Sequence, residues 1–195
     1  MPTTQTLHAL GNQIVFADRA GDFSGSPPAT AANSLLRGTP DYIQWDFGSV
    51  LATALQQSTK GLIIPIAAPE FPMSFSVDAC IEHASAPTAD DTVDFYWFPS
   101  PSATAGTGNG GGVSGADSAY TAGGLAQGFR IGSLILRNTV INIGHIGVLP
   151  MFDRYGSLVV LNGGDQAIAT AADEIHVVFN PILPDGQPPA LRITP

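Results

Sequence analysis

The chain has 195 residues, and only 12% of them are charged, about half of the roughly 25% that is usual in globular domains. Gly (22 residues) and Pro (16 residues) are abundant instead, which disfavours long amphipathic helices and favours short strands joined by turns. The net charge is −9, with Lys or Arg at only seven positions, so we expect neither nucleic acid nor an anionic membrane as a partner.

The N-terminal residues 1–40 are expected to form an extended arm. A short strand is predicted at 13–17, which contains Ile14 and Phe16, and the rest of the arm is rich in small residues with few large apolar ones such as Phe23. Such a segment cannot build a core of its own. A disordered tail and an arm that orders against a neighbouring subunit both stay open. No signal peptide is expected, and no apolar run approaches the roughly 20 residues of a membrane span.

From residue 41 the pattern changes to that of a β domain, which we place at 41–183. Residues 42–47 alternate large apolar and polar side chains, the period of a half-buried strand. The clearest strands are 73–81 and 92–98, and the segment between them contains Ser, Pro and Asp, which are turn residues. These two strands are therefore predicted to form an antiparallel pair joined by a loop.

A long loop dominated by Gly, Ala, Ser and Thr is predicted at 100–124, and loops of this length in a compact domain often carry function. Four further strands are predicted after it, at 129–137, 140–148, 155–161 and 174–179. Residues 184–195 are expected to be a Pro-rich extended tail. Seven to nine strands without a long helix predict an all-β chain: a β-sandwich, jelly-roll-like in a broad sense, with an extended N-terminal arm and a long Gly-rich loop.

The aromatic cluster at 95–98 has side chains on both faces of its strand. Phe95 and Trp97 point to one side, and Tyr96 and Phe98 point to the other. One face is expected to contribute to the core, and the other to meet a loop or a second subunit. A sugar-stacking platform is the alternative interpretation.

No cofactor, metal or catalytic residue is predicted, so we do not expect an enzyme. The Gly-rich loop lacks the Lys and the following helix of a phosphate-binding loop. The histidines are not spaced as a local metal motif. Asp90, Asp91 and Asp94 are the densest acidic group; calcium and acid–base roles stay open, but a turn that caps backbone amides is favoured. Cys80 lies in an apolar run and is expected to be a buried thiol.

Several strings in the later part of the chain resemble uncharacterised, β-rich virion structural proteins of tailed phages. They are the segments 93–109, 112–117, 119–121, 154–160 and 176–182, and the first of them reads VDFYWFPSPSATAGTGN. The resemblance covers roughly residues 70–183, contains no catalytic motif and departs most in the first 40 residues. It implies an accessory protein of the particle and leaves its place in the particle open.

The resemblance and the composition lead to the hypothesis of a capsid decoration (cement) protein, found in the virion and assembled in the host cytoplasm. It would bind the major capsid protein or other virion proteins as a homo-oligomer, with a trimer favoured. The candidate partner-binding residues lie in the arm, on strand 92–98 and in the loop: Ile14, Phe16, Phe23, Tyr96, Phe98, Val113 and Tyr120. A tail or neck component and a carbohydrate-binding module for host-surface attachment are the alternatives.

Overall fold

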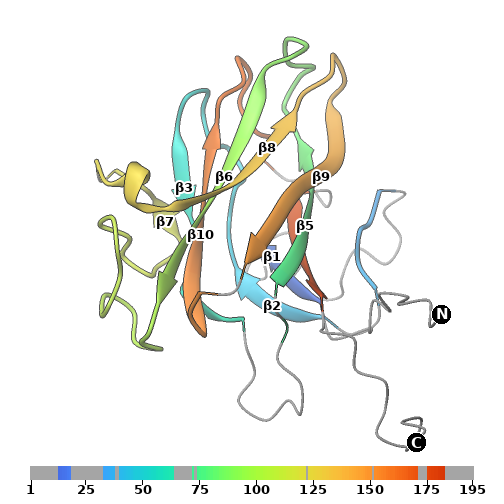
Figure 1. The fold of residues 1–195 in the computed structure, drawn as a ribbon. Helices are drawn as coiled ribbons and strands as arrows, with labels where there is room; N and C mark the ends of the chain where they lie inside the picture. Colours follow the sequence, from blue (N-terminus) through green and yellow to red (C-terminus); the bar gives the residue numbers. More distant parts are fainter. Residues whose placement is uncertain are drawn as a thin grey trace, which may run out of the picture.

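The computed structural model describes residues 13–18, 33–37, 40–63, 72, 74–121, 123–150, 152–170 and 175–182. These residues form two β-sheets that pack face to face, with one short 3-10 turn at Leu125–Gln127 (Figure 1). The prediction of an all-β chain built as a sandwich is confirmed. The expected Pro-rich tail at 184–195 lies outside the described residues, and so do most positions of the expected arm.

The two sheets contain five and six of the described strands. The first sheet contains, in spatial order, β2 (Asp41–Gln44), β1 (Ile14–Ala17), β11 (His176–Ile182), β5 (Ser74–Glu82) and β9 (Ile141–Pro150). The second sheet contains β7 (Ser118–Ala119), β3 (Leu55–Gln57), β10 (Tyr155–Asn162), β6 (Thr92–Ser100) and β8 (Phe129–Ile135), and β4 (Gly61–Leu62) also pairs with β10. All pairs are antiparallel except β1 with β2.

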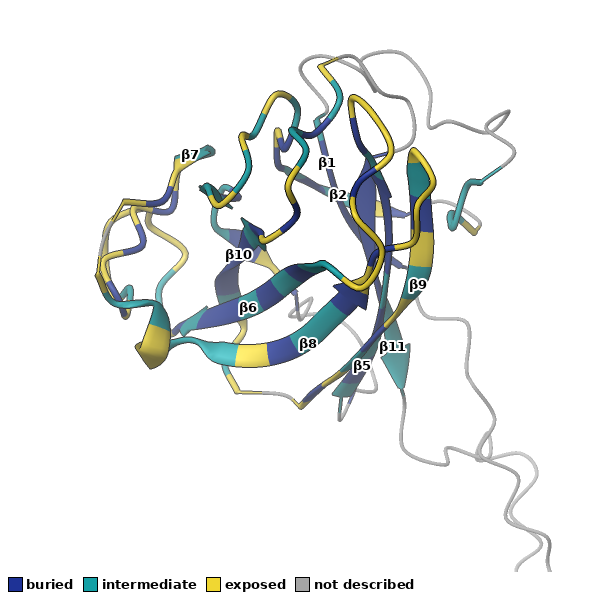
Figure 2. Cartoon of the chain, turned by 90° about the horizontal axis from the view of Figure 1, so that it is seen from above, coloured by how far each residue is buried: buried dark blue, intermediate teal, exposed yellow. Residues whose placement is uncertain are grey.

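The core lies between the sheets and is lined by the apolar members of each alternating strand. In β5 the inward residues begin with Phe75 and Val77, and in β6 they are Val93, Phe95 and Trp97, all buried (Figure 2). This alternation was visible in the sequence, because successive side chains of a strand point to opposite faces. The buried thiol of Cys80, also expected, lies on the outer face of β5, opposite His176 of β11.

The expected pairing of β5 with β6 is wrong, because the two strands belong to opposite sheets. β5 pairs with β11 and β9, and β6 pairs with β10 and β8. The connection between them crosses from one sheet to the other and includes Asp90 in a left-handed conformation (φ 72°). Consecutive strands with an apolar face can bury it either side by side or across the core, and the hydrophobic period is the same in both cases.

The described part of the expected arm is instead an interior strand of the sandwich. β1 lies between β2 and β11, and the ring of Phe16 is 6.2 Å from the ring of Trp97 on the other sheet. Ile14 is buried in the same core. A boundary at residue 40 would therefore separate β1 from β2, its parallel neighbour in the first sheet.

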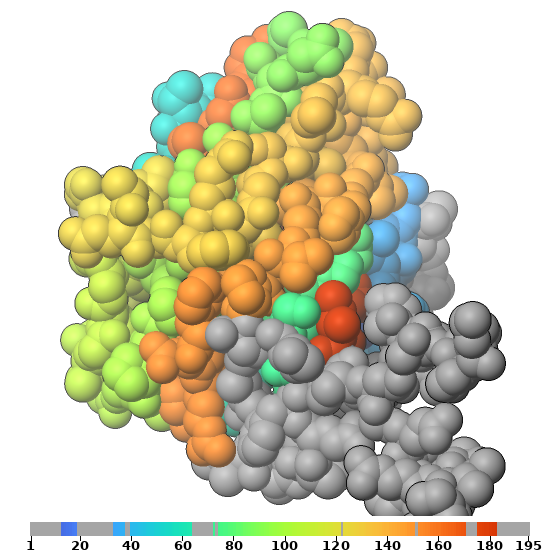
Figure 3. Space-filling model, in the orientation of Figure 1, coloured from blue at the N-terminus to red at the C-terminus, as the bar shows by residue number. Residues whose placement is uncertain are grey.

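The strands β8 and β9 belong to different sheets but lie side by side along one flank (Figures 1 and 3). Glycines allow this approach: a Cβ on Gly147 of β9 would lie 2.6 Å from the carbonyl oxygen of Ile131, and one on Gly132 would overlap Ile146. No side chain can separate the two backbones at this point. The two sheets are therefore nearly joined at this flank.

Candidate interaction site

The Gly-rich loop between β6 and β7 folds over the outer face of the second sheet. Below it, Phe98 of β6, Val113, Tyr120 and Val159 of β10 form a small buried cluster apart from the main core. The hydroxyl of Tyr120 donates a 2.5 Å hydrogen bond to the carbonyl oxygen of Gly111. The loop therefore has an apolar underside of its own, which holds it on the sheet.

The ammonium group of Lys60 lies at the centre of this loop. Its Nζ donates hydrogen bonds to Ser100 Oγ (3.0 Å), to the carbonyl of Thr104 (2.8 Å) and to the carbonyl of Thr107 (2.6 Å). An ammonium has three donors, and all three are used here. Partial burial lowers the pKa of Lys60. The loop is thus held in place by a cation from its own chain.

Gly111 shows why the loop needs glycine where it passes over the aromatic cluster. Its φ is 61°, in the left-handed region, and a Cβ at this position would overlap the ring of Phe98. Its amide donates to Gln127 Oε1 at 3.0 Å, so both polar groups of its backbone have partners. The close approach and the turn both require a residue without a side chain.

The outer side of the loop is an exposed, uncharged surface. Residues 103–108 are all exposed, and residues 101–112 contain no ionisable side chain. The surface offers Thr and Ser hydroxyls and backbone amides in a fixed arrangement. Such a surface suits recognition by shape and neutral hydrogen bonds, and residues 101–112 contain no side chain that can act as a general acid or base.

The sequence-predicted partner-binding residues contribute to this site in an unexpected way. Phe98, Val113 and Tyr120 do come together, but they are buried beneath the loop and contact the chain itself. Ile14 and Phe16, as described above, are core residues. These five side chains are buried by the chain itself and not by a partner. The sequence could not show this, because an apolar face does not reveal whether a distant part of the same chain covers it.

The remaining aromatic candidates are Tyr96, Phe23 and Trp97. Tyr96 is half-buried and packs against the cluster below the loop. Phe23 lies outside the described residues. Trp97, the main residue of the sugar-stacking alternative, is fully buried and packs against Phe16 and Phe179. Its faces are therefore occupied by the core and cannot stack on a sugar ring.

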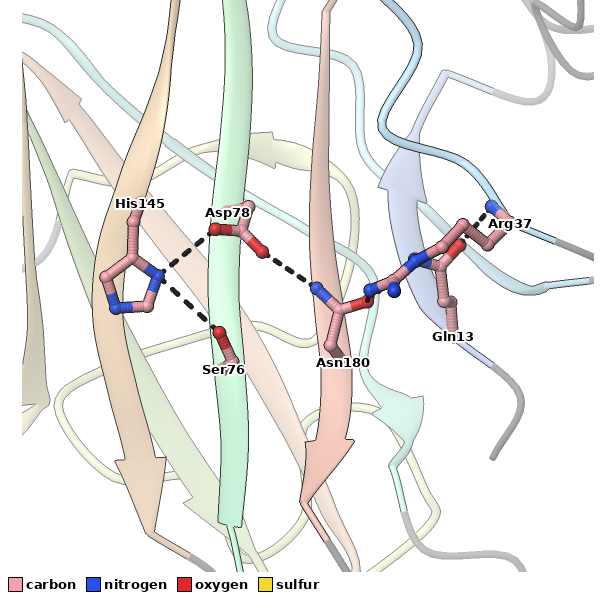
Figure 4. A network of polar contacts seen from close by, with 6 residues as sticks. All are labelled: Gln13, Arg37, Ser76, Asp78, His145 and Asn180. Atoms are coloured by element: carbon pink, nitrogen blue, oxygen red, sulfur yellow. Dashed lines mark hydrogen bonds and ion pairs between the residues drawn. The ribbon is translucent and has the colours of Figure 1, made fainter. Parts of the chain in front are cut away.

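A polar network crosses the outer face of the first sheet (Figure 4). His145 Nδ1 of β9 lies 3.1 Å from Asp78 Oδ1 and 3.5 Å from Ser76 Oγ, both on β5. Ser, His and Asp also form the hydrolase triad, but there the serine and the aspartate contact opposite ring nitrogens. Here both oxygens contact the same nitrogen, so the arrangement does not match that of a triad.

The network continues to a segment that covers part of this sheet, residues 33–37, which we call the strap. Asn180 of β11 donates to Asp78 Oδ2 (2.8 Å) and accepts from the guanidinium of Arg37 (2.6 Å) and from Gln13 (2.7 Å). Gln13 in turn accepts from the backbone amide of Arg37. Sequence reasoning missed this network because its members come from five segments that are far apart in the sequence.

His176 anchors the strap from the sheet below. Its Nε2 accepts a 3.1 Å hydrogen bond from the amide of Leu35, and burial lowers its pKa from 6.5 to about 4. Leu35 and Leu36 pack over Val15 and Val178, so these buried strand residues have cover on their outer side. The neutral imidazole is the form that can accept this bond.

The acidic group at 90–94 has structural partners. Asp91 Oδ2 accepts from the amide of Asp165 (3.2 Å), and Asp94 forms a 3.0 Å ion pair with Arg130. The expectation of a turn at Asp90 is confirmed by its left-handed φ. Within the described residues, no group of three or more His, Cys, Asp or Glu side chains lies close enough to hold a metal ion. Nor do these residues contain a helix that is long and apolar enough to cross a membrane.

No protein-family model, curated protein or solved structure matches the chain.

Proposed function

We propose that the chain is a structural virion protein of a tailed phage, and specifically a capsid decoration protein that binds the outer shell through its Gly-rich loop. The strand order is the observation that carries this proposal. Four strand pairs are nested along the chain: β1 with β11, β3 with β10, β5 with β9, and β6 with β8, all antiparallel. The chain is thus one long hairpin rolled into two sheets.

This nesting supports a jelly-roll fold. The order β1-β11-β5-β9 faces the order β3-β10-β6-β8; these are eight of the eleven described strands, four from each sheet. Jelly rolls with eight strands occur in viral capsid proteins and in lectins. Because a fold alone does not determine a function, the choice between these classes depends on the surface.

The surface favours the capsid class. The Gly-rich loop is the tip of the long hairpin, and it offers an ordered, uncharged surface of small side chains. Binding by an already ordered loop avoids most of the entropy cost of ordering a flexible segment. The resemblance of residues 93–121 to phage virion proteins includes this loop. The sugar-stacking alternative, by contrast, has less support, because Trp97 is buried in the core and cannot contact a sugar.

Purified particles of the virus that encodes the chain provide the test. Cryo-EM density for the chain in many copies over the capsid lattice is the expected result. Density confined to the neck or tail would replace the decoration role with the tail or neck alternative. Absence from the particle, checked by mass spectrometry, would refute a virion role altogether.

The contribution of the loop is tested with shells that lack the chain. Ala103→Arg adds a bulky charged side chain to the exposed part of the loop and leaves the Lys60 hydrogen bonds in place. We expect it to abolish shell binding. Ala86→Arg is the matched control, because Ala86 is also exposed but lies before the first residue of β6, at the end opposite the loop. Equal binding by both variants would exclude the loop as the contact.

A further inference from the structure

The chain contains two Asn-Gly pairs, Asn109-Gly110 in the Gly-rich loop and Asn162-Gly163 at the end of β10. Asparagine is a thermolabile residue, and a glycine after it makes the side-chain amide especially reactive. The backbone nitrogen of the glycine can attack the amide carbon of the asparagine, because no Cβ hinders its approach and the backbone rotates easily. The surroundings of the two pairs differ in this fold, and so does their freedom to react.

Asn162 is held in a closed network of hydrogen bonds. Its side chain is fully buried, and its Nδ2 donates to three backbone carbonyls at 2.9, 3.3 and 3.3 Å. Its Oδ1 accepts from the amide of Gly164 at 3.2 Å. Attack by the nitrogen of Gly163 requires this side chain to turn, which breaks bonds that no water can replace in a buried site. Asn162 is therefore protected while the protein is folded.

Asn109 is held by one side-chain hydrogen bond. Its Nδ2 donates to the carbonyl of Val113 at 2.7 Å, and within the described part of the chain its Oδ1 accepts none. Asn109 is half-buried, and Gly110 is exposed. The amide of Gly110 has no acceptor among the described residues, and a Cβ on it would meet nothing within 4 Å. The attacking nitrogen is therefore free, and water can reach the pair.

We propose that Asn109 is a site of spontaneous deamidation in the folded protein. The nitrogen of Gly110 forms a bond to Cγ of Asn109, Nδ2 leaves as ammonia, and the proton of the attacking nitrogen passes through water to that ammonia. The product is a cyclic imide. Water then opens the imide at the side-chain carbonyl to give aspartate, or at the main-chain carbonyl to give isoaspartate. One water is consumed and one ammonia is released, without an oxidant or a reductant.

The reaction changes both the charge and the shape of the Gly-rich loop. Residues 101–112 contain no ionisable side chain, so a carboxylate at position 109 is the first charge there and takes the net charge from −9 to −10 (−9 − 1). A carboxylate cannot donate to the carbonyl of Val113, so the hydrogen bond is lost and two acceptors face each other. Isoaspartate also adds a carbon to the main chain. The altered surface is the one that the proposed function uses, and this consequence alone rests on that proposal.

Peptide mapping by mass spectrometry tests the proposal on the purified full chain after incubation at mildly alkaline pH. Deamidation raises the mass of the peptide that carries it, and an isoaspartyl methyltransferase labels the isoaspartate product. We expect both signals at Asn109 and neither at Asn162 in the folded protein. In urea both pairs should react, because unfolding removes the bonds of Asn162. Gly110→Ala should abolish both signals at Asn109, because the added Cβ hinders the nitrogen and has open space in the fold.

Two outcomes would overturn the proposal. In the first, Asn109 stays unmodified in the folded chain while the same pair reacts in urea, which would mean that the loop protects it. In the second, Asn109 and Asn162 react equally in the folded chain, which would mean that their hydrogen bonds do not matter. If circular dichroism shows that Gly110→Ala is unfolded, Asn109→Gln replaces it, and signals that persist in that variant would also refute the site. None of these outcomes depends on shell binding, so a failed virion role leaves the test intact.

Discussion

Acidification is expected to loosen the strap through His176, and the effect can be measured as a loss of unfolding free energy. The folded protein holds the pKa of His176 at about 4 because the ring is buried. Its Nε2 accepts a hydrogen bond from the amide of Leu35. In the unfolded chain the same ring returns to its ordinary value of 6.5. Protonation removes the acceptor and places a charge below the strap.

Proton linkage gives the direction and the size of this change in unfolding free energy. Between pH 6.5 and pH 4 the unfolded chain binds more protons at His176 than the folded protein, so stability falls as the pH falls. The contribution is fully present above pH 6.5 and is lost progressively below it. A difference of about 2.5 pKa units at ~1.36 kcal/mol each gives a total loss of ~3 kcal/mol, of which ~2 kcal/mol is lost by about pH 5.

Urea unfolding at pH 7.5 and at pH 5 tests this prediction, with His176→Gln as the key variant. Glutamine keeps an oxygen acceptor for Leu35 but does not titrate, so its pH dependence should be smaller than that of the wild type by ~2 kcal/mol. Burial also lowers the pKa of His83, and this background is common to both proteins. Leu36→Ala is the control, since it weakens the strap but should leave the pH dependence unchanged. Equal pH dependence in the wild type and His176→Gln would refute the reasoning.

Two further predictions concern the Gly-rich loop. Lys60→Met removes three hydrogen bonds and should cost about 1–3 kcal/mol while making residues 101–117 a site of limited proteolysis, and an unchanged digestion pattern would contradict the anchoring role. Gly111→Ala forces a side chain into Phe98 at a left-handed φ and should cost roughly 2 kcal/mol or more in thermal or urea unfolding. Gly110→Ala, with open space around the added Cβ, should be nearly neutral, and equal losses for both alanines would refute the steric explanation.

The sequence was most informative where a strand has one polar face and one apolar face. β5 and β6 show this alternation, and their positions were predicted to within two residues. The strands from β8 to β11 were also located, because turn residues separate them. Which strands pair was not predictable, since the nested pairs join segments far apart, such as β1 and β11. The hydrophobic period contains no information about that choice.

β1 and the Gly-rich loop were misinterpreted for one physical reason. All four residues of β1 are buried, because the core covers one face and the strap covers the other. The strap lies about 20 residues after β1, and Lys60 lies about 40 residues before the Gly-rich loop. Each is therefore distant in sequence from the segment that it holds. The apolar side chains of these two segments were therefore predicted to contact a partner, whereas their cover comes from the same chain.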